Sequence, residues 1–284
     1  MSQGLQINAD RLWDSIMEMA KIDATEKGGN CRLALSDGDK AGRDLFVSWC
    51  EDAGMTCTVD KMGNIFARRP GSDPDAPPVS TGSHLDTQPT GGKFDGVYGV
   101  LAGLEVARTL NEAGIKTRAP LEVICWTNEE GARFAPAMVG SGVFAGAFDL
   151  AYGHGQKDVD GKTMGEELAR IGYLGPEEPG GHKLGAHFEA HIEQGPILEA
   201  KKKPVGVVTG VRASAGTMSR SRAWRPMPAR HRWTCATMPW SARPSSSCSS
   251  TPTPSRKGPM GAPPQRSPTA TRPTRATPLP PTSP

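Results

Sequence analysis

Residues 77–114 read PPVSTGSHLDTQPTGGKFDGVYGVLAGLEVARTLNEAG, and three patterns follow one another in this stretch. Residues 77–82 are a short apolar run, which is typical of a buried strand. Residues 83–96 are rich in glycine and charged residues, which favours a loop. Residues 97–114 carry an apolar helical face and end on Gly114, a common helix stop. A strand, a loop and a helix in this order indicate an α/β domain whose helices cover the faces of a sheet.

Helix and strand patterns alternate before and after residues 77–114, from the first residues to about residue 211. The opening residues have an amphipathic helical pattern, and residues 37–53 predict a helix capped by Ser36 or Asp37. The turn KMGN at residues 61–64 joins two strand-like runs and predicts a hairpin. We therefore expect a mixed sheet flanked by helices. Its expected strands are residues 56–60, 64–70, 77–82, 121–128, 187–195 and 204–211.

The composition points away from a membrane or nucleic-acid protein. The 284 residues carry a net charge of +3, and no apolar run approaches the roughly 20 residues of a membrane-spanning helix. The six cysteines show no C-x-x-C spacing, which favours reduced thiols. We expect a soluble, cytoplasmic protein whose partner is a small molecule.

Histidines and carboxylates follow three of the expected strands. In an α/β sheet, ligands bind outside the carboxyl ends of the strands, so these side chains should share one crevice. Imidazole and carboxylate groups together suit Zn²⁺, Mn²⁺ or Co²⁺. Two adjacent ions need a bridging carboxylate, and paired glutamates allow one to bind metal while the other moves a proton. The candidate residues are His84, Asp86, Asp95, Glu129, Glu130 and His191.

Each of these features also has an ordinary structural interpretation. His84 and Asp86 are compatible with a surface loop, and Glu129 with Glu130 suits the N-terminus of a helix. His191 alone is compatible with a core histidine. The glycines of residues 90–96 either make the loop flexible or let the backbone approach the metals closely. The joint occurrence of these groups at strand ends favours the metal site.

Three motifs resemble a known family. The stretches TGSHLDTQPTGGKFDGVYGVLAGLEV (81–106), WTNEEGARFAPAMVGSGVFAG (126–146) and FEAHIEQGPILE (188–199) are similar to the N-carbamoyl-L-amino acid amidohydrolases. With β-ureidopropionase and allantoate amidohydrolase, these belong to the dinuclear zinc-peptidase-like amidohydrolases. The resemblance covers roughly residues 5–211, and it implies a catalytic domain of that fold.

The resemblance implies two divalent ions, Zn, Mn or Co, and a set of ligands for them. His84 and His191 resemble ligands of the first ion, and Glu130 resembles a ligand of the second. Asp95 resembles the carboxylate that bridges both ions. Asp86 resembles the partner that holds the imidazole of His84 in one tautomer.

The same resemblance implies the reaction. Glu129 resembles the general base, and Gln194 resembles a residue that binds substrate near the carbamoyl group. The implied activity is hydrolysis of the carbamoyl C–N bond of N-carbamoyl-L-amino acids to amino acid, carbon dioxide and ammonia. Allantoate amidohydrolase is the alternative, since both substrates are ureido compounds with a carboxylate. An aminopeptidase fits the HIEQG motif less well.

Residues 212–284 differ from everything before them, because they contain no acidic residue and are rich in Pro, Arg, Ser and Thr. Taken at face value they predict a disordered tail. Read in another frame, residues 223–241 permit MEAHAGPPPLDMRHDALV, which resembles the family's lid motif H-A-G-x-x-P. We therefore expect a frameshift near residues 211–212, and we assign His231 no role.

This hypothesis bears on activity and assembly. The resemblance implies that a lid domain, which also makes the family homodimer, and a last metal-binding histidine are missing from the chain. We therefore expect the chain to be inactive or nearly so. The alternative is a non-enzymatic protein whose basic tail binds nucleic acid. That tail places its arginines among prolines and serines without a regular basic face.

Overall fold

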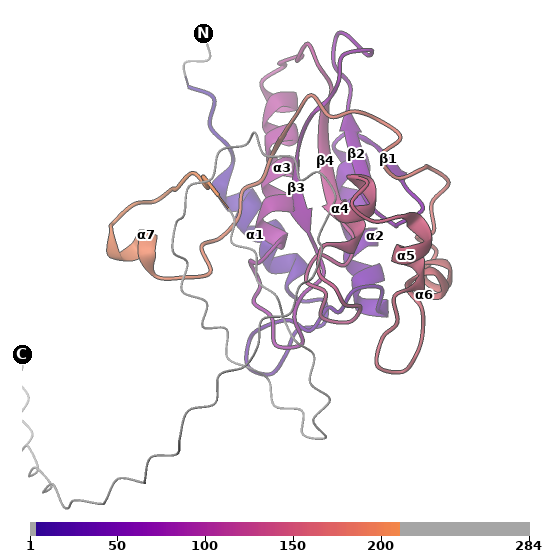
Figure 1. Ribbon diagram of the computed structural model, residues 1–284. Helices are drawn as coiled ribbons and strands as arrows, with labels where there is room; N and C mark the ends of the chain where they lie inside the picture. The colour runs from indigo at the N-terminus through magenta and orange to yellow at the C-terminus, as the bar shows by residue number, and fades with distance from the viewer. Residues whose placement is uncertain (1–3, 211–284) are drawn as a thin grey trace, which may run out of the picture. The chain divides into compact units, whose positions relative to one another are not determined.

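The computed structural model describes residues 4–210, of which residues 4–207 belong to one compact unit. The unit is built on one five-stranded mixed sheet with strand order β1-β2-β4-β3-β5. Figure 1 labels the first four strands of this order, β1, β2, β4 and β3. Strands β3, β4 and β5 are mutually parallel, whereas β2 is antiparallel to both β1 and β4. The strands are β1 (Thr56–Val59), β2 (Ile65–Arg69), β3 (Val79–His84), β4 (Leu121–Trp126) and β5 (Ala186–Phe188).

Seven helices are described in this part of the chain. Polar side chains cap several of them: Asn8 accepts a hydrogen bond from the Arg11 amide in α1, and Ser36 accepts one from the Asp39 amide in α2. Thr163 and Glu166 form a capping box at α6. The helices are α1 (Ala9–Met19), α2 (Asp37–Asp52), α3 (Val97–Glu112), α4 (Val139–Phe144), α5 (Leu150–Gly155), α6 (Met164–Ile171) and α7 (Ile197–Ala200).

The two faces of the sheet are covered differently. Helices α1, α2 and α3 bury one face, and their apolar side chains, such as Ile16, Phe46 and Leu104, join one large core. On the other face Phe66 and Trp126 pack against Phe144 of α4. The predicted α/β class, the hairpin and the helices at residues 37–53 and 97–114 are confirmed.

Two expected strands are wrong in extent. The strand expected at residues 187–195 is limited to β5, and residues 204–210 form no strand. Val205 and Val207 are 77% and 87% exposed, because no neighbouring strand lies beside them in the described structure. β-branched residues favour a strand only where a partner strand supplies hydrogen bonds.

No helix among the described residues is long and apolar enough to cross a membrane. The expected frameshift, the tail and His231 lie outside the described residues, in the range 211–284.

Candidate metal centre

The carboxyl ends of the three parallel strands bring the predicted residues to one edge of the sheet. His84 is the last residue of β3. Glu129 follows the end of β4 by three residues, and His191 follows the end of β5 by three. The register pairs His84 with Trp126, so the ends of β3 and β4 are level with each other.

His84, Asp95 and His191 form a cluster suited to a metal ion. One ligand atom from each lies within 4.8 Å of the others. Asp95 Oδ1 is 3.0 Å from Nε2 of His191 and 3.9 Å from Nε2 of His84. The His84 side chain is buried, and those of Asp95 and His191 are partly exposed, so the cluster opens to solvent on one side.

The hydrogen bonds of both imidazoles favour metal binding. Nδ1 of His84 lies 2.8 Å from the backbone oxygen of Asp86, and Nδ1 of His191 lies 2.8 Å from that of Ile192. A carbonyl only accepts, so each Nδ1 carries the hydrogen and each neutral ring presents the Nε2 lone pair to the cluster. Asp95 Oδ1 is buried and receives no well-aligned hydrogen bond. Two nitrogen lone pairs and an unsatisfied carboxylate oxygen fit a divalent cation such as Zn²⁺, Mn²⁺ or Co²⁺.

The charges of these groups interact strongly. The Asp95 carboxylate raises the pKa of His191 to about 9. Burial alone would lower the pKa of His84, but the neighbouring carboxylates of Asp86 and Glu129 outweigh burial and raise it. Protons and metal ions therefore compete for the same two nitrogens.

Glu129 extends into this cluster from the loop after β4. Its Oε2 is 3.3 Å from Nε2 of His84. The preceding Asn128 has φ of 53°, a left-handed conformation that asparagine tolerates, and it donates its side-chain amide to the backbone oxygen of Phe134 at 2.8 Å. Burial raises the pKa of Glu129, against the opposing effect of His84. A carboxylate with a raised pKa beside a metal site is suited to accept a proton.

Asp86 contacts the imidazole of His84 through its backbone oxygen, whereas its carboxylate supports the loop of Glu129. Its carboxylate accepts the backbone amides of Glu129 and Glu130, each at 3.2 Å. We expected this carboxylate to hold His84, but it lies 3.8 Å from Nδ1, whose partner is the backbone oxygen of Asp86. The difference arises because a motif identifies the residue and not which of its oxygens faces the ring. Burial raises the pKa of Asp86.

Glu130 and Gln194 lie at the rim of the cluster. Glu130 accepts a hydrogen bond from the side chain of Gln88 at 2.5 Å and is not part of the three-residue cluster. Gln194 donates its side-chain amide to Oδ2 of Asp95. The second expected metal position therefore has fewer ligands among residues 4–210 than the first.

Gly96, Ser83 and Gln88 also shape this edge, and of these only Gly96 was noted from the sequence, among the glycines of residues 90–96. Gly96 has φ of 68°, and a Cβ built there would lie 2.5 Å from both ring nitrogens of His84. Ser83 donates a hydrogen bond to Glu189 at 2.5 Å. Gln88 contacts Glu130 as described. The close approach of Gly96 was foreseeable from the glycine-rich loop. The Ser83–Glu189 contact depends on the pairing of β3 with β5, and the Gln88–Glu130 contact on the pairing of β3 with β4.

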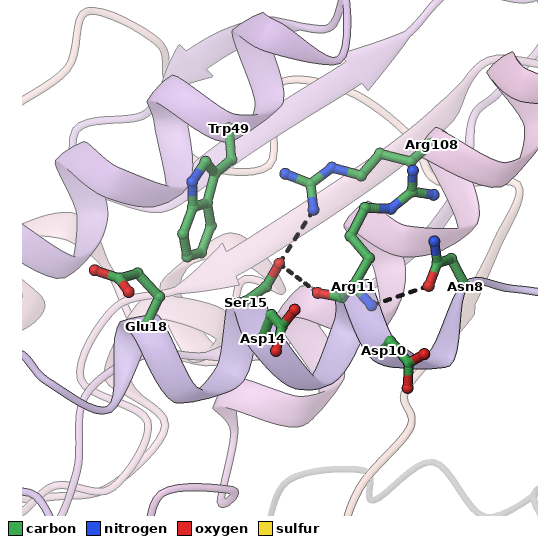
Figure 2. Close-up of a pocket in the computed structure, with 8 residues that line it drawn as sticks. All are labelled: Asn8, Asp10, Arg11, Asp14, Ser15, Glu18, Trp49 and Arg108. Atoms are coloured by element: carbon green, nitrogen blue, oxygen red, sulfur yellow. Dashed lines mark hydrogen bonds between the residues drawn. The ribbon is translucent and has the colours of Figure 1, made fainter.

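A separate hollow of about 620 Å³ is lined by Asn8 and by residues of α1, α2 and α3, and by no residue of the metal cluster (Figure 2). In it the Arg108 guanidinium donates to Ser15 Oγ at 3.2 Å and lies over the ring of Trp49. Asp10, Asp14 and Glu18 project from α1 around the same hollow. Its second arginine, Arg11, donates to Glu105 at 2.7 Å, so both basic groups are already in contact with neighbouring side chains, and we assign the hollow no ligand.

The chain is similar to known proteins in sequence and in structure. It is 65% identical over 204 residues to an N-carbamoyl-L-amino-acid amidohydrolase of Rhizobium meliloti. The aligned region covers 72% of this chain and 49% of that protein. It is 40% identical over 212 residues to an N-carbamoyl-L-amino acid amidohydrolase of Geobacillus stearothermophilus, with 72% and 51% covered. A hydantoinase/carbamoylase family amidase from Burkholderia vietnamiensis has a similar structure, with 66% identity and a TM-score of 0.70 over 71% of this chain and 49% of that one.

The resemblance predicted from the three motifs is confirmed by these relatives, although the chain spans about half the length of each. The sequence pattern of peptidase family M20/M25/M40 matches residues 81–272. This range includes every residue of the metal cluster. The chain belongs to peptidase family M20/M25/M40.

Proposed function

We propose that this chain supplies the metal-binding part of a hydrolase that cleaves the carbamoyl C–N bond of N-carbamoyl-L-amino acids. The observation that supports it is the cluster of His84, Asp95 and His191, with Glu129 beside it. The similarity to amidohydrolases of that substrate class also supports it. The substrate is then a small ureido compound.

In this proposal His84, His191 and Asp95 hold a divalent ion, Zn, Mn or Co. A divalent ion acts as a Lewis acid toward a carbonyl oxygen and lowers the pKa of water. Glu129 accepts the proton from the attacking water and returns it to the leaving nitrogen. Asp86 fixes the position of Glu129 through the two backbone amides that it accepts.

A second ion would use Asp95 as a bridge and Glu130 as a further ligand. Gln194, which contacts Asp95, would then turn toward the carbamoyl group of the substrate. Glu130 is bonded to Gln88, and the described residues offer this ion no histidine. We therefore propose that a full second site needs ligands from outside residues 4–210, and that the chain alone has little activity.

The test compares three samples with each of the three metals: the 284-residue chain, the Rhizobium meliloti relative, and a chimera. The chimera joins residues 1–210 to the part of the relative that follows. We expect the chimera to hydrolyse N-carbamoyl-L-amino acids, and the chain alone to show at most about a hundredth of that rate. Glu129→Gln in the chimera should lower the rate about 10²–10⁴-fold while metal content stays the same.

A folded, metal-loaded chimera that hydrolyses no ureido compound would contradict the proposal. The same assay with allantoate separates the alternative substrate, because a preference for allantoate would assign the chain to allantoate amidohydrolases. Turnover by the chain alone at the rate of the relative would refute the proposed lack of activity.

We also propose that residues 212–284 result from translation in a shifted frame. Sequencing of the gene across the codons for residues 200–284 tests this directly. An insertion or deletion near the codons for residues 211–212 supports it. A clean frame would contradict the frameshift, and the tail would then need its own explanation.

A further inference from the structure

The segment that carries His191 is held to the sheet by an unusual contact. The ladder between β3 and β5 ends at the pair Thr81–Phe188, although β3 continues to His84. His191 therefore lies on residues 189–193, beyond the last paired residue of β5. Its own Nδ1 contact, with Ile192, is local and does not tie it to β3.

Ser83 reaches this segment through its side chain. Its hydroxyl donates to Oε1 of Glu189 at 2.5 Å, and within the described residues this is the one side-chain hydrogen bond between β3 and residues 189–193. Ser83 itself is buried and is paired with Cys125 in the ladder with β4, so the donor is fixed in the middle of the sheet. Glu189 is exposed and sits two residues before His191.

We propose that Ser83 and Glu189 form a latch that positions His191 at the metal cluster. Both are positioning residues: they fix the start of the His191 segment at the point where the β5 ladder stops. His84 needs no such latch, because it is the last paired residue of β3. The expected effect of the latch on metal affinity rests on the proposed function. The anchoring of residues 189–193 by the latch does not, because it is a property of the metal-free chain.

Glu189 also places a negative charge near Glu129 and His191. A role through charge must therefore be separated from a role through the hydrogen bond. Glu189→Gln removes the charge and keeps an oxygen that accepts from Ser83. Glu189→Ala removes both, and its exposure makes loss of the fold unexpected.

The experiment uses the full chain with Ser83→Ala, Glu189→Ala and Glu189→Gln, and with Ser80→Ala as the matched control. Ser80 lies on the same strand and its hydroxyl contacts Nδ1 of His187 at 2.9 Å, within the β5 ladder. Two quantities are measured: hydrogen–deuterium exchange of residues 189–193 in the metal-free chain, and the Kd for Co²⁺ by calorimetric titration. Circular dichroism verifies the fold of each variant.

We expect Ser83→Ala and Glu189→Ala to speed the exchange and to weaken Co²⁺ binding, each by about tenfold or more. Glu189→Gln and Ser80→Ala should stay within about threefold of the unchanged chain in both measurements, since the latch is retained. Exchange in Glu189→Ala equal to that of the unchanged chain would overturn the latch. So would equal losses in Glu189→Gln and Glu189→Ala, which would assign Glu189 a role through charge or direct ligation. If the unchanged chain binds no Co²⁺, the proposed function fails, and the exchange measurement still decides the latch.

Discussion

Replacement of Gly96 by alanine should damage the metal cluster without touching a ligand. Gly96 precedes α3 with φ of 68°, and a Cβ at this position would lie 2.5 Å from Nδ1 and Nε2 of His84. Ordinary contact begins at 3.4 Å, so the imidazole must move by about 1 Å. The ring is 2% exposed and its Nδ1 is bonded to the backbone oxygen of Asp86, so it has no free space to enter.

The expected loss has two parts, and Gly114 provides the control for one of them. Gly114 follows the other end of α3 with φ of 62°, and a Cβ there would meet nothing within 4 Å. Both substitutions place alanine at a positive φ, which costs about 1–3 kcal/mol of backbone strain. Only Gly96→Ala adds the collision, which costs roughly 1–3 kcal/mol more.

Metal binding should separate the two variants more sharply than stability does. Ligand distances in metal sites hold to about 0.2 Å, so a 1 Å displacement of His84 removes it as a ligand. We expect Gly96→Ala to weaken Co²⁺ binding by about a hundredfold or more, which is about 2.7 kcal/mol, and Gly114→Ala to change it less than about twofold. Urea denaturation gives the stabilities, and competition with a chromophoric chelator gives the affinities. Equal Co²⁺ affinities in the two folded variants would refute the reasoning.

Three further predictions concern burial and charge. Burial raises the pKa of Asp60 from 3.8 to about 6, so the protonated form stabilises the fold below pH 4 and this contribution is lost as the pH rises through 6. Urea titrations should therefore show the free energy of unfolding falling by about 2.4 kcal/mol more between pH 4 and 7 in the unchanged chain than in Asp60→Asn. Parallel pH profiles would exclude this. Asp39→Ala should cost about 3–5 kcal/mol in thermal or urea unfolding, because it leaves the fully buried Arg43 without its carboxylate. Lys40→Ala breaks only an exposed pair on the same helix and should cost less than about 1 kcal/mol; a similar loss in both would contradict the burial argument. Asp95→Asn should weaken Co²⁺ binding about a hundredfold or more, since it removes the charged oxygen between the two histidines; unchanged calorimetric titrations would show that the ion binds elsewhere.

The central part of the fold was predictable because each element carries its own signal. Strand β4 is apolar except for Glu122, and all six of its residues are buried, as expected for a strand between two others with both faces covered. The ends of α2 and α3 were foreseen from Ser36 and Gly114. Residues 204–210 have an equally good strand pattern and form none, because a strand depends on a partner that local sequence does not supply.

The candidate site was predictable in its residues and less so in its contacts. Parallel strands place their carboxyl ends together, so His84, Asp95 and His191 were expected to meet, and they do. The role of Asp86 differed, because its backbone oxygen holds the imidazole while its carboxylate holds the loop of Glu129. Such assignments depend on φ and ψ over a few residues, which residue types alone do not determine.

The two histidines of the cluster differ in how the sheet fixes them, and this difference governs which changes the site tolerates. His84 is held by the β3–β4 ladder and by the bond of its ring to the adjoining turn, so it moves only if the core of the sheet moves. His191 lies beyond its ladder and depends on side chains, chiefly Ser83 with Glu189 and the charge of Asp95. Loss of metal through local opening should therefore begin at His191, because a segment outside a ladder opens at lower free energy than a strand within it. Substitutions around β3 and β4 should lower stability and metal affinity together, whereas those around residues 189–193 should lower metal affinity alone.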